Sequence, residues 1–61
     1  MKFEIARSKS KSQPFFWRIV AANGQTLATS ETYTRKASCV SAIASIQANA
    51  ADAKVVDLTA E

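Results

Sequence analysis

Residues 15–27 read FFWRIVAANGQTL, a run of aromatic and β-branched residues that meets an Asn-Gly pair. Such runs favour β-strands, and Asn-Gly favours a tight turn between two strands. A three-residue loop that ends at Gly24 places this glycine where a positive φ is needed. The same loop sets Ile19 opposite Leu27 and keeps both on one face with Trp17. We therefore predict a hairpin with this loop.

An earlier segment has the pattern of a second strand. Residues 2–7 alternate apolar and polar side chains, which is typical of a half-buried strand. The polar residues 8–13 then form an exposed loop, and Pro14 opens the aromatic strand. Pairing the two strands buries Phe3 opposite Ile19 and Ile5 opposite Trp17. Glu4 then lies opposite Arg18, a favourable cross-strand pair.

The second half of the chain predicts one helix and one final strand. From Arg35 to Ala50 the pattern becomes helical, and Thr34 is the expected N-cap. The segment from Lys54 to Leu58 is typical of a strand, with Val56 and Leu58 on one face. The apolar stripe of the helix contains Cys39, Val40, Ile43, Ile46 and Ala50.

The predicted order is β-β-β-α-β, an α+β fold in which residues 1–61 form one domain. The sheet is antiparallel, with one helix on one face. A helix is about 10 Å wide, whereas four strands span nearly 20 Å, so one helix leaves part of the core face uncovered. A homodimer around a two-fold axis would cover it, with exchange of the last strand as a further possibility. The alternative is a monomer with a partly wet face.

Charge and cysteine content restrict the class of protein. Eight Lys and Arg against five Asp and Glu give a net charge of +3, which permits nucleic-acid contact without requiring it. One cysteine and no histidine exclude an internal disulfide and argue against a structural zinc site. No apolar run is long enough for a membrane span, and no signal-peptide core follows the N-terminus. We expect a cytoplasmic protein that does not bind membranes, and the lone Cys39 suits a reducing compartment.

The chain resembles the YegP-like family of small bacterial proteins over most of residues 2–58. The resemblance is carried by an ordered set of residues: Trp17-Arg18, Ala21-Ala22-Asn23-Gly24, Ser30, Glu31, Tyr33, Lys36-Ala37, Ile43, Ser45-Ile46, Asn49-Ala50, Asp52-Ala53 and the strand from Val55 to Asp57. It implies a β3-α-β unit that occurs singly or in tandem. It also implies that two units share one sheet with exchanged C-terminal strands, which for this chain means a homodimer.

The family has no established biochemical function, so the resemblance implies a fold and no activity. Two features of this chain depart from the family pattern. Thr32 stands where similar members often carry glycine, and the basic loop from Arg7 to Gln13 is unusual.

Nothing in the chain favours catalysis or a cofactor. Histidine, the commonest general base, is absent. Cys39 lies on the apolar stripe, which indicates a buried core residue rather than a nucleophile. No serine lies in a nucleophile elbow, and the single glycine is used in the turn, so no phosphate-binding loop exists. We therefore expect a non-enzymatic protein without cofactor or metal.

Two kinds of binding function remain open. The first is a small module that interacts with proteins, including a second copy of itself; an exposed strip of Phe15, Phe16 and Val20 would serve this role. The alternative is binding of single-stranded RNA or DNA through the open sheet face and the basic loop. That face would show Lys2, Phe16, Arg18, Val20 and Thr26. The candidate nucleic-acid or partner contacts are Arg7, Lys9, Lys11, Phe16 and Arg18.

Overall fold

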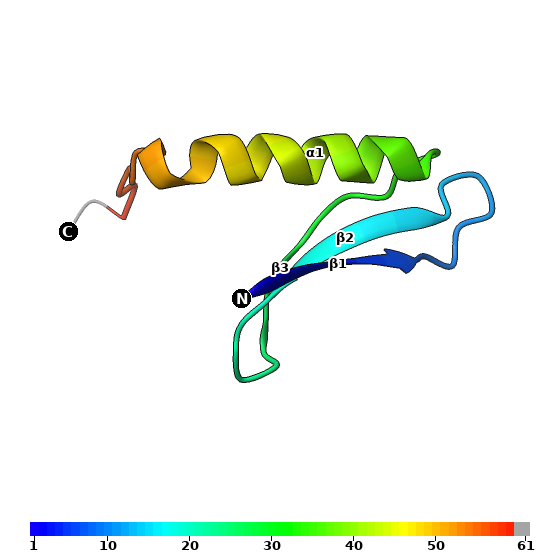
Figure 1. Cartoon of the computed structure of the whole chain (residues 1–61), viewed down its shortest axis with the longest axis horizontal. Helices are drawn as coiled ribbons and strands as arrows, with labels where there is room; N and C mark the ends of the chain where they lie inside the picture. The colour runs from blue at the N-terminus through cyan, green and yellow to red at the C-terminus, as the bar shows by residue number, and fades with distance from the viewer. Residues whose placement is uncertain (60–61) are drawn as a thin grey trace.

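A computed structural model describes residues 1–59 and has one helix packed on a three-stranded sheet (Figure 1). The strands are β1 (Lys2–Arg7), β2 (Phe15–Val20) and β3 (Thr26–Thr29), and they are antiparallel in the order β1-β2-β3. Helix α1 (Lys36–Asn49) and the short 3-10 helix η1 (Ala50–Asp52) follow. The α+β class is therefore confirmed. The helix lies chiefly over the central strand β2, and β1 and β3 are the two edges of the sheet.

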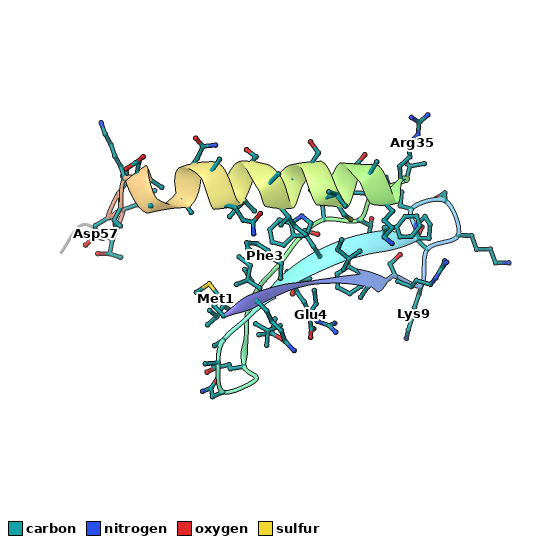
Figure 2. The ribbon with its side chains drawn as sticks, viewed as in Figure 1. Met1, Phe3, Glu4, Lys9, Arg35 and Asp57 are labelled. Atoms are coloured by element: carbon teal, nitrogen blue, oxygen red, sulfur yellow. The ribbon has the colours of Figure 1, made fainter. Side chains whose placement is uncertain are left out.

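The predicted register of the first hairpin is confirmed at every residue pair. Phe3 lies opposite Ile19, Ile5 opposite Trp17 and Glu4 opposite Arg18. Alternation along the strands places these four apolar residues on the side of α1 and the charged pair on the other side. Figure 2 shows Phe3 pointing toward the helix and Glu4 pointing away from it. The rings of Phe3 and Trp17 pack edge to face, with 6.1 Å between their ring centres.

The turn between β2 and β3 has the predicted three-residue loop. The amide of Ala21 donates to the carbonyl of Gln25 at 2.8 Å, and the amide of Gly24 donates to the carbonyl of Ala21 at 2.9 Å. Gly24 has a φ of 88°, the left-handed region that glycine adopts without strain.

The ladder beyond this turn contains a bulge that the sequence analysis missed. Val20 lies opposite Thr26, but Ile19 lies opposite Ala28, so Leu27 is the extra residue of β3. The prediction that Ile19 faces Leu27 is therefore wrong by one residue. A bulge adds one residue to one strand and bends it, and Leu27 is left 53% exposed.

The core is thin, as the small number of large apolar residues suggests. Among the described residues only Val20 and Cys39 are buried, with 5% and 0% exposure. This burial pattern corrects two predictions, one about the apolar stripe of the helix and one about the open face of the sheet. Val40 of the predicted helix stripe is 52% exposed and Ala50 is exposed, because the contacts of α1 are centred on one strand. Val20, predicted to be exposed on the open face, is buried, because it lies on the central strand between Lys2 of β1 and Thr26 of β3.

Both ends of the helix differ from the prediction. The N-cap is Arg35 rather than Thr34, and its side chain makes no capping hydrogen bond. After η1, residues 53–59 form no strand, so the predicted last strand is absent from a single chain. The reason is geometric: the C-terminal turns of α1 project past the sheet, and the segment that follows has no strand of its own sheet beside it (Figure 1).

We expect Gly24→Ala to destabilise the protein. No atom lies within 4 Å of a Cβ built at Gly24, so the loss comes from the positive φ alone and amounts to about 1 kcal/mol. Urea unfolding at fixed protein concentration measures it. Gly24→Asn is the matched control, because asparagine tolerates this conformation better and loses less. Equal stability of Gly24→Ala and the parent would contradict the turn geometry.

Candidate interaction surfaces

The outer face of the sheet carries a network of four side chains. The guanidinium of Arg18 donates from Nε to Oε1 of Glu4 at 2.6 Å, and Nζ of Lys2 lies 3.2 Å from Oε2 of the same carboxylate. Arg18 also lies over the Phe16 ring, with 5.8 Å between the guanidinium carbon and the ring centre. Glu4 is thus shared by two cations, which neutralise it from both sides.

This network changes the electrostatics of the open face. The hydrogen bonds from Arg18 and Lys2 lower the pKa of Glu4 below its ordinary value. A carboxylate held between two cations also reduces the positive potential that a phosphate would meet there. Arg18 is therefore paired with Glu4 and stacked on Phe16. This pairing lowers the positive charge that the open face could present to a nucleic acid, compared with what its composition indicates.

The three candidate residues that belong to strands, Arg7, Phe16 and Arg18, lie on two different faces of the sheet. Phe16 and Arg18 are on the outer face, whereas Arg7 lies opposite Phe15 in the register and shares the helix side of the sheet. The guanidinium of Arg7 stacks over the Phe15 ring at 5.5 Å. Phe15 therefore does not join Phe16 in a common exposed strip, and Val20 of that predicted strip is buried.

A shallow hollow of about 310 Å³ lies beside this stacked pair. It is lined by residues of β1, the start of β2 and the first residue of α1: Ile5, Ala6, Arg7, Phe15 and Lys36. Three of its lining residues are apolar and two are cations. The sequence analysis did not name Lys36 as a candidate contact residue. The sequence feature that could have indicated it is the pair Arg35 and Lys36 at the start of the helix, where the helix dipole disfavours positive charge.

The β1–β2 loop is held by its own serines. The Ser8 hydroxyl donates to the carbonyl of Gln13 at 2.6 Å, and the Gln13 amide donates to the Ser10 hydroxyl at 3.1 Å. Gln13 also accepts a hydrogen bond of 2.9 Å from the Thr32 hydroxyl, which ties the loop to the segment before α1. Lys9 and Lys11 are left exposed on this loop.

The C-terminal segment that follows η1 exposes large apolar side chains. Val55 is 97% exposed, Val56 is 70% exposed and Leu58 is 87% exposed. Asp57 between them accepts hydrogen bonds from the amide and the hydroxyl of Thr59, which lower its pKa.

Cys39 is the one thiol among the described residues. Cys39 is fully buried, and desolvation raises the pKa of its thiol, which disfavours the nucleophilic thiolate. Within residues 1–59 no three Cys, Asp or Glu side chains gather in a way that could hold a metal ion. None of the helices in that range has the length and apolar character needed to cross a membrane.

Comparison with known sequences places this arrangement in a family. Residues 10–57 match the family described as a domain of unknown function, DUF1508. The chain belongs to this family. A UPF0339 protein of Treponema denticola is 47% identical over 57 residues, which cover 93% of this chain and 95% of the relative. A UPF0339 protein of Agrobacterium fabrum is 48% identical over 58 residues, covering 95% of this chain and 90% of the relative.

The family also includes the protein named in the resemblance drawn from the sequence. The UPF0339 protein YegP of Escherichia coli is 47% identical over 47 residues, which cover 77% of this chain and 41% of YegP. The predicted membership of a YegP-like, uncharacterised family is thus confirmed. No solved structure matches the chain.

The pKa shift of Glu4 predicts a pH-dependent contribution to stability. A carboxyl with a lowered pKa in the folded state stabilises that state above the unfolded pKa, and the contribution disappears as pH falls through the folded pKa. We therefore expect Glu4→Gln to unfold at lower urea concentration than the parent at neutral pH. The difference should shrink below about pH 4.

The matched control for Glu4→Gln is Glu31→Gln. Glu31 is exposed and makes no ion pair among residues 1–59, so its substitution should change stability little at either pH. Identical urea midpoints for Glu4→Gln and the parent at neutral pH would show that the network contributes nothing.

The burial of Cys39 predicts slow reaction with a thiol reagent. We expect the native protein to react with a disulfide reagent at pH 8 at least about tenfold more slowly than the protein in urea. Ser45→Cys supplies the control within the same helix, because Ser45 is exposed and a cysteine there should react fast. Equal rates for the two thiols in that variant would contradict the packing of α1.

Proposed function

We propose that residues 1–61 form a single non-enzymatic interaction module that acts as a homodimer. Each copy inserts its C-terminal segment, residues 54–58, as a strand at an edge of the partner's sheet. The observation that carries this proposal is the exposure of Val55, Val56 and Leu58, each at 70% or more. Three large aliphatic side chains in five residues are unfavourable in water unless another surface covers them.

The sheet offers places for such a strand. Strands β1 and β3 are both edges, with rows of backbone groups free to pair with another chain. All four residues of β3 are exposed, although Leu27 and Ala28 are apolar. Because addition of a strand satisfies backbone hydrogen bonds and covers side chains together, an exposed edge and an exposed apolar segment suit each other.

The thin core supports the same conclusion. A domain of this size is marginally stable even when well packed, and among residues 1–59 two are buried. The helix covers mainly the central strand, so Ile5 and Leu27 on the outer strands stay 37% and 53% exposed. A second copy would supply the missing apolar contacts.

A binding role without catalysis is supported by the chemistry of the side chains. The one thiol is buried, its pKa is raised, and the serines of the basic loop are engaged in loop hydrogen bonds. The free state of Cys39 supports a reducing compartment such as the cytoplasm.

The oligomeric state tests the proposal. Light scattering of the parent protein should give about twice the 6.6 kDa of one chain. Val56→Asp combined with Leu58→Asp should give a single-chain mass, because the charges oppose burial of this face of the segment. Ser45→Asp, on the outward face of α1, is the control and should leave the mass unchanged.

Hydrogen exchange distinguishes strand insertion from simple association. The amides of residues 55–58 should exchange slowly in the parent protein and lose this protection on dilution or in the double-aspartate variant. A single-chain mass for the parent would overturn the homodimer. A mass of two chains combined with fast amide hydrogen exchange in residues 55–58 would overturn the strand insertion.

A further inference from the structure

Five of the eight cations of the chain lie at one end of the molecule. Arg7 ends β1, Lys9 and Lys11 lie in the loop that follows, and Arg35 and Lys36 begin α1. These segments are distant in sequence, but the hydrogen bond from Thr32 to Gln13 joins the loop to the segment before the helix. Figure 2 shows Lys9 and Arg35 at the same end of the molecule. We call these five residues the basic end.

The basic end is not neutralised by acidic side chains. Among residues 1–59, none of its five cations forms an ion pair; the two ion pairs there both use Glu4, with Lys2 and Arg18. Asp52 and Asp57 lie beyond the C-terminal end of α1, at the opposite end of the helix. Glu31, one residue before Thr32, is the acidic residue near this end, so a large positive excess remains.

The positions of Arg35 and Lys36 are unfavourable for the helix itself. The N-terminus of a helix carries the positive end of its dipole, where acidic residues and capping side chains are stabilising. Here the first turn has no acidic residue, and Arg35 makes no capping hydrogen bond. Helix stability therefore does not explain the two cations, and a bound anion would complement both the cations and the dipole.

The hollow beside the stacked Arg7 and Phe15 adds an apolar part to this surface. Its lining combines the ring of Phe15 and the side chain of Ile5 with the two cations Arg7 and Lys36. An anion that also carries a flat apolar group matches this combination. Nucleotides have this chemistry, with a base that stacks on aromatic rings and a phosphate that binds cations.

We propose that the basic end binds single-stranded nucleic acid. One base occupies the hollow against Phe15, and its phosphate lies between Arg7 and Lys36. The neighbouring phosphates contact Lys9, Lys11 and Arg35. The site differs from the open sheet face, where Glu4 neutralises Arg18, and it does not depend on the homodimer.

Anisotropy of a labelled 12-nucleotide RNA, titrated with the full protein at several salt concentrations, tests the proposal. The four phosphates contacted in this arrangement predict a slope of about −2.8 for log affinity against log salt, or about a fiftyfold loss between about 50 and 200 mM. The combined Lys9→Ala, Lys11→Ala and Lys36→Ala variant should reduce the slope to about −1.4. A duplex of the same sequence should bind more weakly, because its bases cannot enter the hollow.

Lys9→Ala and Lys54→Ala form a matched pair, since both remove one exposed lysine and the same charge. Lys9→Ala should weaken binding severalfold, whereas Lys54→Ala, past the opposite end of α1, should not. Light scattering and Trp17 fluorescence check that every variant keeps its assembly and fold. Absence of binding at low salt would overturn the proposal, as would equal effects of the two lysines or equal affinity for duplex.

Discussion

The register in which β1 pairs with β2 decides which side chains face helix α1, because a shift by one residue would turn every side chain to the other face. In the observed register Phe3 and Trp17 meet beneath the helix, while Glu4 meets Arg18 on the outer face. The apolar pairs and the ion pair therefore favour the same alignment. This agreement explains how so short a chain with so small a core selects one sheet.

Much of this arrangement could be predicted from the sequence, because local patterns and pairing rules act in the same direction. The alternation of residues 2–7, the Asn-Gly turn and the match of Glu4 with Arg18 were enough to derive the first hairpin and the loop at Gly24. The bulge at Leu27 could not be derived, since alternation assumes an unbroken ladder. The exposure of Val20 was predicted wrongly because alternation gives the face of a residue, not how far its neighbours on both flanking strands cover it.

The candidate contacts were harder to predict than the strands. Sequence analysis assigned Phe16 and Arg18 to the open sheet face and Arg7 to the basic loop, and treated all three as parts of one contact surface. The pleat of the sheet separates them, since Arg7 shares a face with Phe15 and the other two face outward. Lys36 lies far away in sequence and reaches the same hollow as Arg7 only through the packing of α1.

The two ends of α1 differ in chemistry, and this difference connects the two proposals. The N-terminal end gathers cations that form no ion pair within residues 1–59 beside an aromatic ring, whereas the C-terminal end leads into exposed valines and leucine with acidic neighbours. Apolar side chains gain most by leaving water, and cations gain by meeting anions without being buried. The C-terminal segment is therefore suited to permanent assembly, and the basic end to a salt-dependent, reversible contact. Because strand insertion would use the sheet edges and the apolar segment, the loop cations Lys9 and Lys11 would stay exposed to solvent in a homodimer.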